Sequence, residues 1–157
     1  MKPTLYMETS VVSYLNARPS KDIVLEARQL NTREWWQTKR RHFTIFVSRF
    51  VFDEASDGDA EMVRRRLSTI KSLPWLQMNR AVALLAKALV AHDALPLVAA
   101  QDAIHVALAA VHGIHFLATW NMKHINNPAT AETMREVCHN AAFHCPVICT
   151  PEELLAV

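Results

Sequence analysis

The chain has 157 residues, of which 51% are hydrophobic and 20% are charged, and its formal net charge is +2. These values are ordinary for a globular protein with a buried core, and we expect one domain over residues 1–157. No stretch approaches the roughly eighteen apolar residues of a membrane-spanning helix, and no signal pattern opens the chain, so we expect a cytoplasmic protein with no membrane partner. The two glycines, Gly58 and Gly113, fit neither a dinucleotide fingerprint nor a Walker A loop, which excludes nucleotide-binding enzymes of those types.

Strands and helices alternate along the chain. In chain order we expect a strand over 4–8, helices over 10–16 and 21–41, a strand over 43–48, helices over 49–56 and 59–73, a strand over 75–78, helices over 81–95 and 98–113, a strand over 115–120, a helix over 130–143 and a strand over 146–150. Ser10 and Ser48 are the expected caps of the helices that follow them, and Gly113 is an expected helix stop. This alternation is typical of an α/β fold, in which helices cover a parallel sheet.

The first expected strand ends on a carboxylate. Glu8 follows an apolar run and precedes two hydroxyl residues, Thr9 and Ser10. A carboxylate at a buried strand end is costly unless a cation or hydrogen-bond donors satisfy it. Ligands of open α/β sheets bind beyond the carboxyl ends of the strands. Two interpretations therefore stay open: Glu8 belongs to a functional site, or it caps the following turn.

Glu54 and Asp102 are the other carboxylates in apolar surroundings. Glu54 follows Phe52 on a short helix that we expect to face the core in part. Asp102 lies near the start of an apolar helix, where either the helix dipole or a bound metal accounts for a charge. The nearby acidic residues are expected to be solvated or to cap turns, namely Asp53, Asp57, Asp59 and Glu61. Clustered hard oxygens are what Mg²⁺ or Mn²⁺ requires, and such a centre activates a water for phosphoryl displacement.

These motifs together resemble a PIN domain, of the kind found as the VapC toxin of bacterial toxin–antitoxin pairs. The matching pieces are the strand-end "METS", the glutamate of "SRFVFDE", the aspartate of "QDAIHVALA" and the "LATWN" that follows a strand. The match spans nearly the whole chain in the right order. The family usually has Asp-Thr/Ser at the first position and Thr-x-Asp at the last.

The resemblance implies a three-layer α/β/α domain and a metal-dependent endoribonuclease that cleaves RNA phosphodiester bonds through a metal-activated water. It implies Mg²⁺ or Mn²⁺ ligated by Glu8, Glu54 and Asp102, with Asn121 at the fourth position. RNA, a cognate antitoxin protein and a second copy of the chain are the partners that it implies. Two positions depart from the family: Glu8 is one methylene longer than the commoner Asp, and Asn121 lacks the charge of an Asp.

Two other functions stay open. One is a non-catalytic PIN-like domain that binds RNA or protein, in which the altered acidic set no longer holds metal. The other is a small α/β phosphatase or phosphotransfer domain, which the missing Asp-x-Asp pair at a strand end disfavours.

The remaining polar groups have weaker patterns. Lys123 and His124 lie in the loop after a strand, where they either face a scissile phosphate or belong to a turn over 126–128. None of the eight histidines has the spacing of a zinc motif, and we expect satisfied surface or helix-end groups. The three cysteines form no C-x-x-C pair, and we expect free thiols.

The long second helix carries two adjacent tryptophans and a basic cluster. We expect Trp35 or Trp36 to pack inside while the other lies at an interface. The cluster over 39–41 either guides RNA toward the acidic site or is a solvated helix end.

Overall fold

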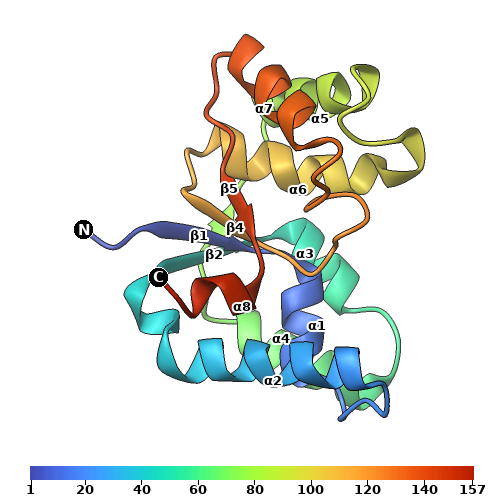
Figure 1. Ribbon diagram of the computed structural model, residues 1–157, viewed down its shortest axis with the longest axis vertical. Helices are drawn as coiled ribbons and strands as arrows, with labels where there is room; N and C mark the ends of the chain where they lie inside the picture. The colour runs from blue at the N-terminus through green and yellow to red at the C-terminus, as the bar shows by residue number, and fades with distance from the viewer.

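A computed structural model describes residues 1–157 and has a five-stranded sheet at its centre (Figure 1). The strands are β1 (Thr4–Met7), β2 (Thr44–Ser48), β3 (Trp75–Leu76), β4 (Phe116–Ala118) and β5 (Val147–Cys149). All pairings are parallel, and the strand order is β3-β2-β1-β4-β5. The predicted α/β class with a central parallel sheet is confirmed.

Helices cover both faces of the sheet. One layer contains α1 (Thr9–Asn16), α2 (Ile23–Thr38), α4 (Ala60–Ile70) and α8 (Pro151–Leu154), and the other contains α5 (Arg80–Ala91), α6 (Ala100–Val111) and α7 (Ala131–Asn140) (Figure 1). The short α3 (Arg49–Ala55) follows β2, and two 3₁₀ turns, η1 (Arg40–His42) and η2 (Leu97–Ala99), follow α2 and precede α6. The arrangement is the predicted three-layer α/β/α fold. No helix is both long enough and apolar enough to cross a membrane.

β1 is the central strand because its side chains are apolar on both faces. Leu5, Tyr6 and Met7 are fully buried, as expected for a strand covered on two sides. Tyr6 pairs with Phe46 of β2 on one side and with Leu117 of β4 on the other. The chain builds outward from β1 through β2 and β3, then returns to the opposite side with β4 and β5. The carboxyl ends of β1 and β4 therefore form the switch point at which ligands bind in open α/β sheets.

The cap of α1 differs from the prediction. Glu8, and not Ser10, is the N-cap residue, and its carboxylate accepts a hydrogen bond from the Ser10 backbone N–H. The reason is the strand end: Glu8 keeps the extended backbone of β1, so the helix begins one residue earlier, at Thr9. The predicted cap of α3 is confirmed, because the Ser48 hydroxyl accepts from the Val51 N–H at 3.4 Å.

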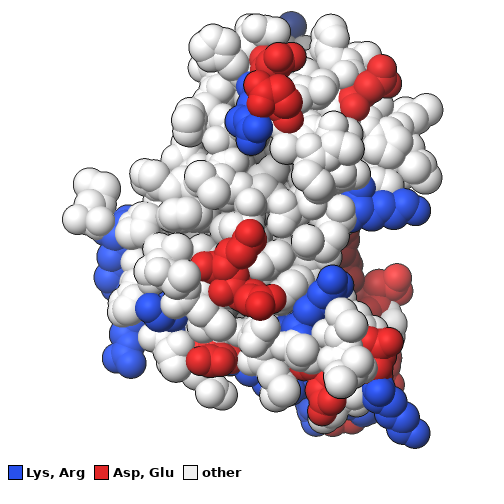
Figure 2. Space-filling view, viewed as in Figure 1, with Lys and Arg blue, Asp and Glu red and all other residues white.

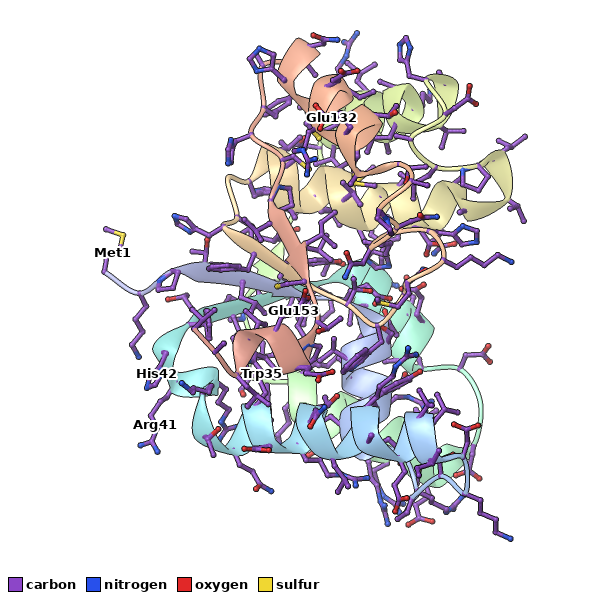
Figure 3. The ribbon with its side chains drawn as sticks, in the orientation of Figure 1. Met1, Trp35, Arg41, His42, Glu132 and Glu153 are labelled. Carbon is purple, nitrogen blue, oxygen red and sulfur yellow. The ribbon has the colours of Figure 1, made fainter.

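The two adjacent tryptophans of α2 have different surroundings. Trp35 is fully buried between α2 and the rest of its layer (Figure 3). Trp36 is half-buried, and the Arg40 guanidinium lies 4.5 Å from the centroid of its ring. The prediction that one of them packs inside is confirmed for Trp35. Beyond them, Arg41 and His42 extend from η1 at the end of this helical layer (Figure 3).

Candidate active site

Glu8 stands at the carboxyl end of β1 and is almost fully buried, with 5% of the residue exposed. Its Oε2 accepts hydrogen bonds from the Ser10 N–H at 3.1 Å, from the Ser10 hydroxyl and from the Thr119 hydroxyl at 2.8 Å. Three donors on one oxygen satisfy the charge without a cation. Of the two interpretations of Glu8, the structure shows the helix cap. Its second oxygen, Oε1, accepts no hydrogen bond.

Glu54 approaches the same region from α3. Its Oε1 accepts from the Thr9 hydroxyl at 2.6 Å and lies 2.7 Å from Nε2 of His105. Burial raises the pKa of Glu54, but the hydrogen bond and charge of His105 and the Thr9 hydroxyl outweigh it, so the net pKa lies below the ordinary value. Glu54 is half-buried, as predicted for a partly core-facing helix.

His105 is a fully buried imidazole that connects three elements. Its Nε2 pairs with Glu54 of α3, and its Nδ1 lies 2.7 Å from the Tyr6 hydroxyl of β1. The Tyr6 hydroxyl in turn lies 2.7 Å from Oγ of Ser48, so a continuous chain of polar contacts crosses the core. The prediction of surface or helix-end histidines is wrong for His105, because polar partners from two other elements, Glu54 of α3 and Tyr6 of β1, compensate its burial.

The electrostatics of this core chain favour charge separation. Burial lowers the pKa of His105, but the Glu54 hydrogen bond and the charges of Glu8, Glu54 and Asp102 outweigh it and raise the pKa above the ordinary value. Burial raises the pKa of Tyr6 far above its usual range, so the phenol stays neutral. The raised pKa favours the imidazolium form of His105, which is the form that makes an ion pair with the Glu54 carboxylate.

Asp102 lies in the first turn of α6, three residues before His105 and one helical turn away. It is half-buried, and its carboxylate has no ion pair and accepts no hydrogen bond from the protein. Its charge, like those of Glu8 and Glu54, acts on His105. Of the three predicted carboxylates, Glu54 contacts His105 directly, whereas Glu8 and Asp102 act on it through their charges.

Asn121 has a local structural role. Its Oδ1 accepts from the His124 N–H at 3.0 Å, and its own N–H donates to the Thr119 hydroxyl at 2.9 Å. Thr119 also donates to Glu8, so a single hydroxyl connects Asn121 with the end of β1. The carboxamide therefore stabilises the turn after β4 beside the carboxylates.

The segment after β4 is fixed by its buried tryptophan. The Trp120 indole N–H donates to the Thr32 hydroxyl at 2.8 Å, and the ring stacks on Tyr14 with centroids 5.8 Å apart. The Trp120 backbone N–H donates to the Ser10 hydroxyl at 2.8 Å. These contacts hold Thr119 and Asn121 against the start of α1.

The donor chemistry suits a hard cation, but the side chains do not form a finished metal site. Glu8 Oε1, Glu54 Oε2 and the Asp102 carboxylate accept no hydrogen bond from the protein. Carboxylate oxygens with free lone pairs are the ligands that Mg²⁺ and Mn²⁺ prefer. Nowhere in the chain, however, do three or more acidic, histidine or cysteine side chains meet as a metal-holding group.

The sequence reasoning missed the groups that orient the carboxylates. Thr9, Ser10 and Thr119 hold Glu8 and Glu54, and His105 holds Glu54 from inside the core. One signal was available for His105: it lies three residues after Asp102, which puts both on one side of a helix. No protein-family model matches this sequence, and no curated protein matches it. The resemblance to PIN domains thus stays a prediction based on short motifs.

Proposed function

We propose that this chain is a metal-dependent endoribonuclease of the PIN-domain type that acts as the toxin of a toxin–antitoxin pair. The observation that supports it best is the contact of Glu54 with His105, together with the charges of Glu8 and Asp102, which act on the same imidazole. Glu8 stands at the carboxyl end of the central strand β1, where open α/β sheets bind ligands. A concentration of acidic side chains at that point favours chemistry with a divalent cation over direct binding of a phosphate anion.

The proposed ligands are the oxygens that the protein leaves free on Glu8, Glu54 and Asp102, with the Asn121 carboxamide beside them. A bound Mg²⁺ or Mn²⁺ supplies a water of lowered pKa and neutralises charge on the scissile phosphate. The protein's own contribution is orientation. His105 and Thr9 hold Glu54, while Ser10 and Thr119 hold Glu8.

Lys123 completes the proposed site. It is exposed in the turn after β4, two residues beyond Asn121. An ammonium group in this position stabilises negative charge that develops on a phosphoryl oxygen. It also offsets the repulsion between the three carboxylates and an approaching RNA strand.

The test is RNA cleavage as Mn²⁺ or Mg²⁺ is titrated into the purified chain. Asp102→Asn is the informative variant because it removes one charge and no hydrogen bond from the protein, and we expect it to abolish cleavage. Asp93→Asn is the matched control, since Asp93 is exposed and its φ of 60° is one that asparagine tolerates. Cleavage that persists in Asp102→Asn would point to a contaminating nuclease and would overturn the mechanism.

A non-catalytic PIN-like domain that binds RNA or protein is the second candidate. It is favoured by the engagement of Glu8 as a helix cap and by the lack of any finished metal-holding group. Calorimetry separates the two functions, because the nuclease proposal requires a Mn²⁺ binding heat that Asp102→Asn reduces. The second candidate requires RNA or protein binding with no such heat.

A homodimer belongs to the same proposal. Leu97 and Val98 of η2 are 80% and 88% exposed, beside an apolar groove of about 410 Å³ that Leu97 lines together with Val90 and Ile104. An exposed apolar knob next to an apolar groove on one surface is self-complementary across a two-fold axis. The antitoxin rests on the resemblance alone, and a neighbouring reading frame for a short protein would support it.

A further inference from the structure

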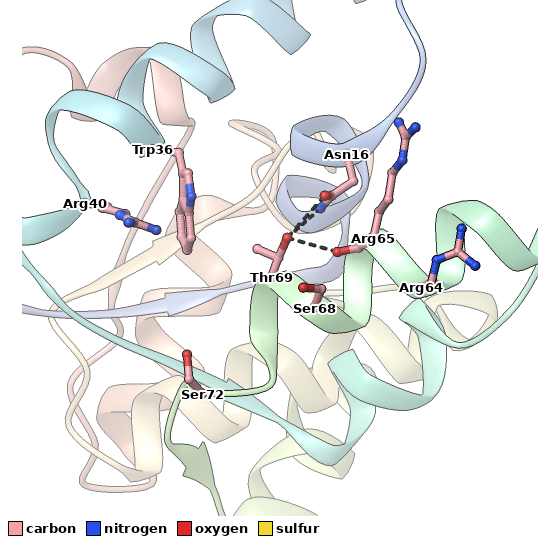
Figure 4. Close-up of a pocket in the computed structure, with 8 residues that line it drawn as sticks. All are labelled: Asn16, Trp36, Arg40, Arg64, Arg65, Ser68, Thr69 and Ser72. Atoms are coloured by element: carbon pink, nitrogen blue, oxygen red, sulfur yellow. Dashed lines mark hydrogen bonds between the residues drawn. The ribbon is translucent and has the colours of Figure 1, made fainter.

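A basic groove lies between α4 and the end of α2. It is separate from the carboxylate site, by which we mean Glu8, Glu54 and Asp102. It has a volume of about 590 Å³, and Figure 4 shows Arg40 and Trp36 on one side and residues of α4 on the other. Its lining residues are Asn16, Trp36, Arg40, Arg64, Arg65, Ser68, Thr69 and Ser72. A second cavity of about 340 Å³ shares Trp36, Arg40, Thr69 and Ser72 with it and adds Arg41. The two cavities thus form one continuous surface feature, which we call the α2–α4 groove.

The α2–α4 groove carries positive charge that the protein does not neutralise. No carboxylate lines either cavity. Arg40, Arg41 and Arg64 make no salt bridge, whereas Arg65 pairs with Glu61 at 2.6 Å. Unpaired guanidinium groups that share a concave surface attract an anion more strongly than isolated surface charges do.

Neutral donors lie among these charges. The hydroxyls of Ser68 and Ser72 make no hydrogen bond within the protein, while Thr69 is bonded to Asn16. Arg40 is held in place by Trp36, because its guanidinium lies 4.5 Å from the ring centroid. Hydroxyls, arginines and an aromatic face are the groups with which proteins contact the phosphates and bases of a single strand.

The opposite side of the same helical layer has a different charge. Figure 2 shows acidic side chains over α8, which contains Glu152 and Glu153, and basic side chains toward the η1 end of α2. A polyanion is therefore repelled from the α8 surface and drawn to the η1 end, where the α2–α4 groove begins.

We propose that the α2–α4 groove binds the phosphate backbone of the RNA strand whose scissile bond lies at the carboxylate site. This inference rests on the proposed nuclease function for its substrate. α1 joins the two places, since its N-cap Glu8 is in the carboxylate site and its last residue, Asn16, lines the groove. Eight helical residues span about 12 Å. That separation equals three to four steps of a stacked strand at about 3.4 Å each.

RNA explains the groove better than an acidic protein segment does. Arginines alone account for carboxylate binding, but free serine hydroxyls and a half-buried indole add contacts that phosphates and bases use. Binding of an acidic peptide is the competing outcome that the experiment must detect.

The experiment measures the affinity of the full chain for a single-stranded RNA of about twelve nucleotides. EDTA prevents cleavage, and the fluorescence anisotropy of labelled RNA is followed from about 50 to 200 mM salt. The test variant is Arg40→Gln/Arg64→Gln. The control variant, Lys21→Gln/Arg80→Gln, removes the same charge from exposed residues that precede α2 and open α5. All four positions are exposed, so both variants should keep the wild-type unfolding temperature, which circular dichroism checks.

We expect the groove variant to bind RNA about tenfold more weakly and the control to stay within about twofold of the wild type. The slope of log K against log salt should fall by about 1.4 in the groove variant, because two phosphate contacts on a single strand contribute about 0.7 each. Equal affinities and slopes for the two variants would overturn the inference. The inference would also be overturned if the wild-type chain bound polyglutamate through the groove and showed no binding to RNA.

The experiment distinguishes the proposal that the α2–α4 groove binds RNA from the proposal that the chain cleaves RNA. Groove-dependent RNA binding without cleavage under Mn²⁺ would support the inference and count against the nuclease. Cleavage under Mn²⁺, with RNA binding that does not depend on the groove, would support the nuclease and overturn the inference about the groove.

Discussion

Nε2 of His105 lies 2.7 Å from Oε1 of Glu54, so the orientation of a candidate ligand is fixed by a fully buried imidazole. The Tyr6 hydroxyl holds the other ring nitrogen. Glu54 is therefore positioned during folding, before any ligand arrives, and the carboxylate site is supported from the core of the sheet rather than from its surface.

Removing this support should destabilise the protein. His105→Ala removes one of the two partners of Glu54 and one of the two partners of Tyr6, and it opens a cavity. We expect the free energy of unfolding to fall by about 3 kcal/mol in urea titrations. His112→Ala is the control, because His112 makes one exposed bond to the Gln77 carbonyl and should cost about 0.5 kcal/mol. Equal losses for the two variants would contradict a structural role for the His105 chain.

Tyr6→Phe tests the next member of the chain. The substitution keeps the ring in the core and removes only the hydroxyl between Ser48 and His105. We expect a loss of about 1–2 kcal/mol, since a buried His105 nitrogen is left without its partner. Denaturant unfolding measures it, and an unchanged midpoint would show that the hydroxyl contributes nothing.

Glu8 and Asp102 should differ in what they contribute to stability. Glu8→Ala removes a helix cap with three donors, and we expect a loss of about 2 kcal/mol. Asp102→Ala removes no hydrogen bond, and we expect the loss of its charge at the start of α6 and near His105 to cost less than about 1 kcal/mol. Thermal unfolding of both variants under one buffer condition makes the comparison, and the reverse order would show that Asp102 has a partner we have not identified.

The three free thiols should react at different rates. The neighbouring Cys138 thiol and the charge of Arg135 together outweigh burial and lower the pKa of Cys145, whereas burial raises the pKa of Cys149 to about 12. At neutral pH the Cys145 thiolate is therefore the more populated, and iodoacetamide should modify Cys145 first. Mass spectrometry of the native chain reads the order, and the denatured chain is the control in which the three rates converge. Faster modification of Cys149 would contradict the assignment.

The proposed dimer should depend on the exposed apolar side chains of Leu97 and Val98 in η2. Val98→Asp places a charge where a partner would bury it, and we expect at least a tenfold loss of dimer affinity in sedimentation velocity. Leu30→Asp is the matched control, because Leu30 is also exposed but lies on α2, away from η2. Equal effects of the two substitutions would move the interface elsewhere.

Local patterns were sufficient to predict most of the architecture. The buried run before Glu8 and the β-branched run before Ser48 became β1 and β2, because strand patterns and helix caps depend on adjacent residues. The last helix, α8, was missed even though Thr150 and Glu153 form a capping box that is visible in the sequence. A helix of four residues is too short to show a hydrophobic period, so the capping box is its single local signal.

The site was predictable only in part. The carboxylates stood out because each interrupts an apolar pattern, which is a local signal. The partners of Glu54 did not stand out, since Thr9 and His105 lie 45 and 51 residues away along the chain and meet it only in three dimensions. Whether Glu8 caps a helix or faces a ligand likewise depends on which donors lie near it, and those include Thr119, which follows β4 and lies 111 residues away along the chain.

α1 is pinned at both ends, by the Glu8 carboxylate at its start and by the bonds between Asn16 and Thr69 at its finish. A short helix held in this way has a fixed length and acts as a spacer. If the basic groove anchors one phosphate, that spacer decides which bond of the strand comes to rest opposite the acidic residues. The cleavage position would then be set by its distance from the bound phosphate, without base-specific contacts in between.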